Sequence, residues 1–180
     1  MPRPATLQHL ETAPAAHNLR HLRDCFGMFA TGVTIITTRG AADEMIGLTA
    51  SSFNTLSLSP PLVLWSLGAN SASLPMFRQA LYFSVNVLES HQMALATRFA
   101  KKNIDRFDGV AWHPGLNKVP LIDGALAWFE CETRSVNEFG DHVLFVGEVL
   151  RCARVEGSPL LFRKGEYAVS QAWDHSHARK

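Results

Sequence analysis

Residues 49–66 read TASSFNTLSLSPPLVLWS and place a run of hydroxyl and amide side chains before two prolines and a short apolar segment. Segments rich in β-branched and apolar residues flank this run, and such segments favour strands. One interpretation is a Ser/Thr-rich hairpin whose polar face meets water. The other is a wall of hydrogen-bond donors that binds a ligand. The stretch alone leaves both open.

Strand signals surround this stretch on both sides. They are β-branched or alternating runs bounded by turn residues, such as Arg39-Gly40 after the first of them. In the last third of the chain, two long runs precede a short hairpin that turns at Lys164-Gly165. The predicted strands are residues 33–38, 45–50, 53–58, 62–67, 82–88, 125–136, 142–151, 160–162 and 167–169.

Helical periodicity is limited to three segments. Residues 17–30 carry an apolar stripe that predicts an amphipathic helix packed on a larger body. Residues 74–81, with Ser71 or Ser73 as N-cap, and residues 89–100 predict two more helices. Residues 101–124 hold several turn dipeptides and predict a long irregular connection, a kind that is often functional. Many strands without βαβ alternation predict a mainly β single domain with a few helices, built as a closed or partly closed β-barrel.

Length and composition are those of one globular domain. The chain has 180 residues, 47% hydrophobic and 18% charged. We expect a flexible leader over 1–16, the domain over 17–171 and a polar tail over 172–180. A charged fraction this low indicates that part of the surface is covered, for example by a second subunit. The net charge is +1 without a basic patch, which argues against nucleic acid as a partner.

Membrane, disulfide and metal signals are weak. No apolar run approaches the roughly 18 residues that a membrane helix needs. Cys25, Cys131 and Cys152 are odd in number and widely spaced, which disfavours a disulfide framework and fits a cytoplasmic protein. His17 and His21 are four residues apart but lack the Glu of a metalloprotease motif, so we interpret them as a solvated pair and expect no metal.

The common catalytic and nucleotide-binding motifs are absent from the sequence. It contains no G-x-G-x-x-G after a strand, no P-loop and no G-x-S-x-G elbow. Glu130 and Glu132 share one face of a predicted strand with Arg134, and we interpret them as a solvated or Arg-paired row rather than an acid–base pair. The tryptophans are more typical of core than of a cofactor site.

Three stretches together resemble the short-chain flavin reductases, the NAD(P)H-dependent reductase components of two-component flavin monooxygenases. They are residues 26–35 (FGMFATGVTI), residues 48–53 (LTASSF) with 60–64 (PPLVL), and residues 140–149 (GDHVLFVGEV). Residues 70–75, 83–88 and 161–167 are also similar, so the resemblance spans about residues 20–171. It implies an FMN-binding split β-barrel, a homodimer with flavin sites near the subunit boundary, and transfer of reduced flavin to a partner monooxygenase.

The resemblance also implies the reaction and a set of flavin-binding residues. NADH or NADPH gives hydride to FMN or FAD, so the protein mainly positions two rings and needs no catalytic nucleophile. Neutral donors on the phosphate side suit a flavin that must be released. The implied ring, ribityl and phosphate contacts come from Thr31, Gly32, Val33, Thr34, Thr49, Ala50, Ser51, Ser52, Ser66, Asn70, Ser71 and Ser73, with Arg98, Phe99, Ala100 and Lys101 closing over the flavin.

His142 is the implied contact to the nicotinamide, oriented by Asp141, and Tyr167 is expected to line the same cleft. Taken alone, a His at the start of a strand is more often structural. The chain departs from the family pattern at residues 54–57 and at Trp65, which stands where a smaller residue is common. Trp65 is expected to narrow the cleft or stack on a ring, which leaves the choice between FMN and FAD open.

Two other hypotheses fit the same barrel. One is an electron carrier that retains its flavin and does not use nicotinamide directly. The other is an enzyme resembling pyridoxamine-phosphate oxidases, which would need several Arg or Lys side chains for a second phosphate. Residues 49–66 contain none, so this hypothesis ranks low.

Overall fold

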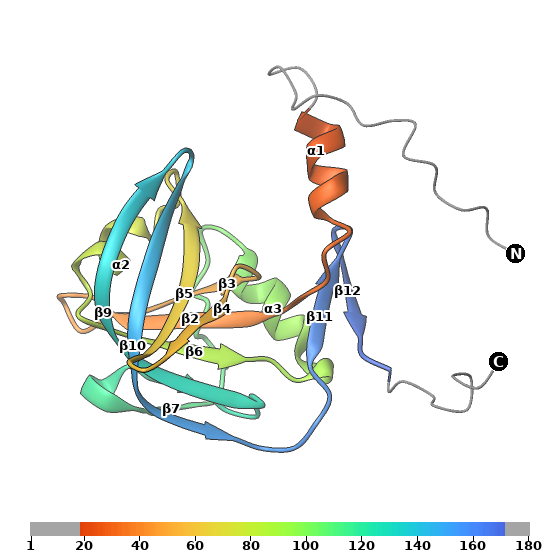
Figure 1. Ribbon diagram of the computed structural model, residues 1–180. Helices are drawn as coiled ribbons and strands as arrows, with labels where there is room; N and C mark the ends of the chain where they lie inside the picture. Colours follow the sequence, from red (N-terminus) through yellow and green to blue (C-terminus); the bar gives the residue numbers. More distant parts are fainter. Residues whose placement is uncertain (1–18, 172–180) are drawn as a thin grey trace, which may run out of the picture.

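The computed structural model describes residues 19–171, and most of this region is antiparallel β-sheet (Figure 1). The leader, the C-terminal tail and His17 lie outside the described residues. The helices are α1 (Leu19–Phe26), α2 (Leu74–Gln79), α3 (Met93–Ala100) and the 3₁₀ turns η1 (Ser90–Gln92) and η2 (Leu116–Lys118). The strands are β1 (Thr31–Gly32), β2 (Thr34–Arg39), β3 (Met45–Ala50), β4 (Asn54–Leu58), β5 (Pro61–Gly68), β6 (Tyr82–Val87), β7 (Trp112–Pro114), β8 (Pro120–Ile122), β9 (Ala127–Phe139), β10 (His142–Arg154), β11 (Leu160–Arg163) and β12 (Glu166–Val169).

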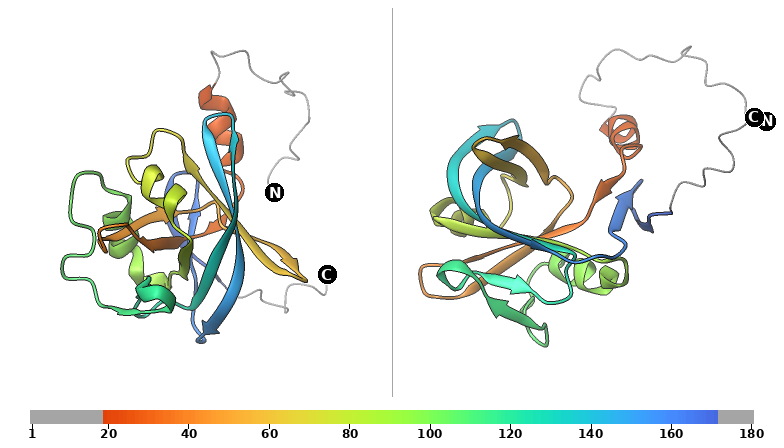
Figure 2. Two further views of the ribbon diagram at one scale, coloured as in Figure 1. Left: turned by 90° about the vertical axis from the view of Figure 1, so that its left-hand side faces the viewer. Right: turned by 60° about the horizontal axis from the view of Figure 1, so that its bottom comes forward.

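Seven strands form one curled sheet in the order β3-β2-β6-β9-β10-β5-β4. Its two edge strands, β3 and β4, are not hydrogen-bonded to each other, so the sheet wraps around its core without closing. This confirms the prediction of a mainly β domain with a few helices, and it is consistent with a split barrel. Figure 2 shows the curl and the β4–β5 hairpin extending from it.

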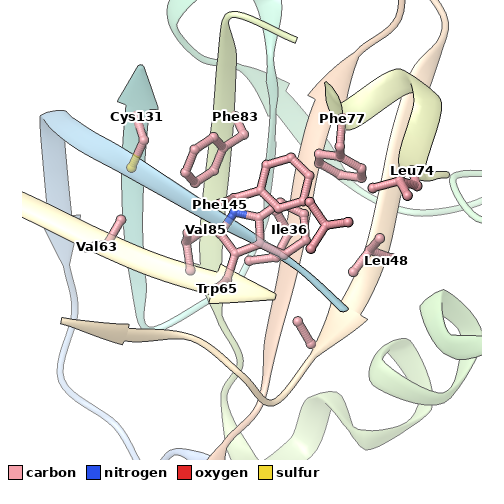
Figure 3. Packing of buried hydrophobic residues seen from close by; sticks show 12 residues of the cluster. Ile36, Leu48, Val63, Trp65, Leu74, Phe77, Phe83, Val85, Cys131 and Phe145 are labelled. Atoms are coloured by element: carbon pink, nitrogen blue, oxygen red, sulfur yellow. The ribbon is translucent and has the colours of Figure 1, made fainter. Parts of the chain in front are cut away.

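Aromatic rings fill the centre of the curled sheet (Figure 3). Trp65 on β5 and Phe145 on β10 are register partners, and their rings stack at 4.4 Å with 10° between the planes. Phe77 and Phe83 meet the Trp65 ring edge-on. The expectation that Trp65 narrows a cleft or stacks on a cofactor is therefore wrong, because the side chain is fully buried in this cluster.

The connection over 101–124 is more ordered than the sequence predicted. β7 and β8 form a two-stranded ribbon in which Pro114 and Pro120 are register partners at the ends of the strands. Proline lacks a backbone donor, so it is tolerated at such strand ends. The Asn86 side chain fixes the ribbon to the sheet, since its Oδ1 accepts from the Ile122 backbone N–H at 2.8 Å and its Nδ2 donates to the Ile35 carbonyl.

The first helix differs most from its prediction. It covers only Leu19–Phe26, and none of its residues is buried. It stands beside the β11–β12 hairpin, away from the curled sheet, and we call α1 with β1, β11 and β12 the arm (Figures 1 and 2). The apolar stripe that predicted packing on a larger body is exposed within one chain: Phe26 is 68% and Phe29 76% exposed.

Two smaller expectations are settled by side-chain contacts. The second helix ends at Gln79, and Ser73 is its N-cap without a side-chain capping hydrogen bond. Glu130 is buried and receives a two-pronged contact from Arg151, at 2.9 and 2.8 Å, while Glu132 pairs with Arg134. The row is therefore Arg-paired, as one of the two interpretations held. In residues 19–171 no group of His, Cys, Asp or Glu side chains could hold a metal ion.

Candidate functional site

A cleft of about 510 Å³ opens where β3, the end of β5, the loop before α2 and the loop after α3 meet. This volume is in the range of small-molecule sites. Leu48, Leu67 and Phe99 supply apolar wall, and polar groups come mainly from the 68–73 loop. The sequence-predicted residues that line the cleft are Thr49, Asn70, Ser71, Ser73, Phe99, Ala100 and His142, with Asp141 beside it.

The donors on this wall are set by local hydrogen bonds. Thr49 Oγ1 donates to the Ala96 carbonyl at 2.6 Å, which ties β3 to α3. Ser71 Oγ accepts from the Ser73 backbone N–H at 3.3 Å. Within residues 19–171 no side-chain hydrogen bond holds Asn70, so its amide is available to a ligand in the cleft.

His142 is placed at one end of the cleft by the sharp β9–β10 turn. Gly140 takes a φ of +58°, which glycine adopts without strain, and Asp141 follows it. The Nδ1 of His142 lies 2.7 Å from Asp141 Oδ1, so the carboxylate orients the imidazole. This hydrogen bond holds the pKa of Asp141 below its usual value. The Asp141 carbonyl accepts from the Ala69 N–H, which links the turn to the cleft loop.

Other predicted residues lie beside the cleft rather than in its wall. Ser51 and Lys101 are exposed, and Ala50 is buried. Ser52 Oγ is held by Ser66, since it accepts from the Ser66 N–H and donates to the Ser66 carbonyl, both at 2.9 Å. Arg98 is used to fix the following loop, because its guanidinium donates to the carbonyls of Arg106 and Asp105.

The remaining predicted residues belong to the arm or to its junction with the sheet. Thr31 and Gly32 pair with β11, and Tyr167 packs edge-on against Phe162. Val33 and Thr34 are buried, and Thr34 Oγ1 donates to the Ala50 carbonyl at 2.8 Å. Within one chain none of these five residues lines the cleft.

Two cations in the wall were missed by the sequence reasoning. Arg106 and Lys102 line the cleft, and neither was among the cations expected there, which were Arg98 and Lys101. The Arg106 guanidinium is half-buried, and this burial lowers its pKa. The only sequence signal for it was its place in a long connection of the kind that is often functional.

Comparison with known proteins yields a family and close relatives. Residues 26–170 match the family described as "Flavin reductase like domain". The chain is 42% identical over 154 residues to the FMN reductase (NADH) SmoA of Agrobacterium fabrum, covering 86% of this chain and 87% of the relative. It is 37% identical to the reductase component of the flavin-dependent trigonelline monooxygenase of Acinetobacter baylyi, covering 85% of this chain but about half (49%) of that relative.

A solved structure is similar over nearly the same region. The NADH:FAD oxidoreductase SgcE6 of Streptomyces globisporus, in complex with NAD and FAD fragments, superposes with a TM-score of 0.81 at 38% identity. The matched part covers 88% of this chain and 96% of that chain. No helix in residues 19–171 combines the length and the apolar character needed to cross a bilayer.

Proposed function

The chain belongs to the flavin reductase-like family, and from this premise we propose that it is an NAD(P)H:flavin oxidoreductase supplying reduced flavin to a separate monooxygenase. The observation that carries the proposal is the cleft itself. It brings Thr49, the 70–73 donors and Phe99 to one wall and puts His142 at one end. This combination of apolar surface with a few convergent polar groups is typical of a small-molecule site.

The chemistry asks the protein to bind and orient rather than to supply a nucleophile. When bound, the flavin accepts a hydride from NADH or NADPH at its ring system. The apolar side chains of Leu48, Leu67 and Phe99 exclude water from part of the cleft, and the 68–73 loop offers hydrogen-bond donors. His142, oriented by Asp141, contacts the nicotinamide in this proposal.

The cleft is partly open to solvent, and its lining residues offer hydrogen bonds and apolar contacts. Such a site suits a flavin that enters as FMN or FAD and leaves reduced. The relatives named as reductase components of flavin-dependent monooxygenases support an oxygenase as the consumer of the product.

The arm supports a homodimer. Exposed apolar side chains on it include Leu19, Phe26, Met28, Phe29 and Val169. Several large apolar side chains left exposed on one part of a fold are typical of an interface. Thr31 and Tyr167 lie on the arm, so their assignment to the flavin site depends on how a second chain seats against it. The three cysteines are unpaired, which supports a cytoplasmic location.

The test is steady-state NADH and NADPH oxidation, followed by absorbance, with FMN, FAD or riboflavin in turn. The proposal expects nicotinamide oxidation that depends on added flavin. Absence of turnover with every flavin would overturn it. A yellow protein that keeps its flavin through gel filtration and does not oxidise NADH would instead indicate a flavin-retaining electron carrier.

A further inference from the structure

The loop over residues 101–106 forms part of the cleft wall but has almost no backbone pairing of its own. Lys102, Asn103 and Arg106 line the cleft from this loop. Residues 102–106 lie outside every helix and strand, and they form no backbone–backbone hydrogen bond within the described part of the chain. Side chains, rather than secondary structure, must therefore hold this part of the wall in place.

Two arginine side chains close the loop by binding its carbonyl groups. From α3, Arg98 Nε donates to the Arg106 carbonyl at 2.9 Å, and its Nη2 donates to the Asp105 carbonyl at 2.8 Å. Arg106 Nε donates back to the Lys101 carbonyl at 2.9 Å. Its Nη1 donates to the Gly47 carbonyl on β3 at 2.6 Å. One guanidinium thus holds each end of the loop, and Arg106 also joins the loop to β3.

The two arginines differ in their position relative to the cleft. Arg106 lines the cleft, whereas Arg98 does not. The Arg98 side chain is 35% exposed, and its contact with the Asp108 carboxylate, at 3.5 Å, is longer than its contacts with the two carbonyls. A planar guanidinium can bind two carbonyls at once in a fixed geometry, which a lysine ammonium on its flexible stem does less well. Arg98 therefore acts on a ligand in the cleft only through the loop.

We propose that Arg98 is a positioning residue that holds the 101–106 loop at the cleft and so limits the rate at which the flavin leaves the protein. The inference rests on the proposed function, because the flavin is the ligand assigned to this cleft. A segment with few backbone hydrogen bonds opens locally at a low free-energy cost, and Arg98 raises that cost. Since the loop opens before the flavin leaves, the loss of Arg98 acts on the dissociation rate constant.

The experiment measures the association and dissociation rate constants of FMN and riboflavin by stopped-flow fluorescence, without NADH, for the wild type, R98Q and R98K. R98Q should raise the dissociation rate constants of both flavins by the same factor, roughly 3- to 30-fold, the range for losing one or two hydrogen bonds. The association rate constants should change much less. R98K should restore part of the retention, because an ammonium can still bind one carbonyl.

The matched control is D108N, which removes the carboxylate near Arg98 and leaves both carbonyl contacts in place. It should release both flavins at the wild-type rate. An unchanged dissociation rate constant in R98Q would overturn the inference. A change for FMN alone would overturn it too, because it would indicate a direct contact with the flavin phosphate. Slower association with unchanged dissociation would do the same, since Arg98 would then shape the site rather than retain the ligand.

Trypsin supplies a second measurement that does not need a folded variant. Trypsin cleaves after lysine and arginine, and Lys101, Lys102 and Arg106 all lie in the loop. Where opening is fast relative to cleavage, the cleavage rate follows the population of the open form. Saturating FMN or riboflavin should slow cleavage of the wild-type loop, with the cut sites identified by mass spectrometry, and R98Q should be cut there faster than wild type. A wild-type loop cut at the same rate with and without flavin would overturn the inference.

Failure of the proposed function would look different. In that case the wild-type protein would reduce no flavin at all. An enzyme that reduces flavin and releases it at the same rate in the wild type and R98Q keeps the function and loses only the Arg98 assignment.

Discussion

The hydroxyl of Ser52 and the backbone of Ser66 form a closed hydrogen-bond pair, in which Ser52 Oγ accepts from the Ser66 N–H and donates to the Ser66 carbonyl, both at 2.9 Å. The pair joins the loop after β3 to β5, which are the two ends of the stretch 49–66. The Ser52 hydroxyl therefore holds the loop after β3 against β5.

Replacing this hydroxyl should cost stability. In S52A two partly buried backbone groups of Ser66 lose their partner, and we expect the free energy of unfolding to fall by about 1–3 kcal/mol. Urea unfolding with an unchanged m-value measures it. S51A removes an exposed neighbouring hydroxyl and serves as control. Equal stability of S52A and S51A would contradict this role.

His142 should contribute to the binding of the nicotinamide more than to the binding of the flavin. Its side chain is about half exposed (52%), so H142A should leave the fold intact. We expect H142A to raise the KM for NADH more than the KM for flavin, measured by steady-state kinetics. D141N keeps the imidazole but replaces the carboxylate that orients it, and should give a smaller change in the same direction. Equal changes in both KM values would refute the role.

Gly47 leaves room for the rings that support the cleft. A Cβ at this position would lie 2.6 Å from the Phe99 ring and 3.1 Å from Phe107, both buried. G47A should therefore lower the free energy of unfolding by about 1–3 kcal/mol through overpacking. Thermal unfolding tests this, with G68A as control because no atom lies within 4 Å of a Cβ there. An unchanged free energy of unfolding in G47A would contradict this, because it would show that the Phe99 and Phe107 rings move to make room for the methyl group.

Glu89 should make stability depend on acid pH. It caps η1: its carboxylate accepts from the His91 N–H at 2.8 Å, while Gln92 Oε1 accepts from the Glu89 N–H. The His91 backbone hydrogen bond is the main cause that lowers the pKa of Glu89 from 4.5 to about 2. Because the folded-state pKa is the lower one, this stabilisation is complete above pH 4.5 and is lost as the pH falls toward about 2.

The E89Q variant tests that dependence. Its stability should change less than that of wild type between pH 4.5 and about 2, as measured by urea titrations at a series of pH values. E156Q removes an exposed carboxylate outside the cap and should keep the wild-type slope. Parallel curves for E89Q and wild type would contradict the capping account.

The strands were predictable because their signals are local. The predicted strand over 45–50 coincides with β3, and the hairpin turning at Lys164-Gly165 is present as β11 and β12. Alternating apolar residues and turn residues lie close together in the sequence, so strands can be recognised from them without knowledge of the fold. The polar wall at 70–73 and the His142 end of the cleft followed from the family resemblance.

The parts that escaped prediction depend on contacts between distant residues. Trp65 became core because the β5–β10 register places it opposite Phe145, 80 positions later in the chain. Arg106 reaches the cleft because Gly47, 59 positions earlier, accepts its hydrogen bond. The apolar stripe of α1 was identified correctly, but the sequence could not show that the described residues of the same chain leave every residue of the helix unburied.

The exposed apolar stripe of α1 has a consequence for thermal stability. Under the proposed homodimer, much of the arm gains its burial only when two chains meet, so folding of the arm and association are linked by mass action. The temperature at which the protein melts would then rise with the amount of protein in the cell or the cuvette, and heat tolerance would be a property of the pair.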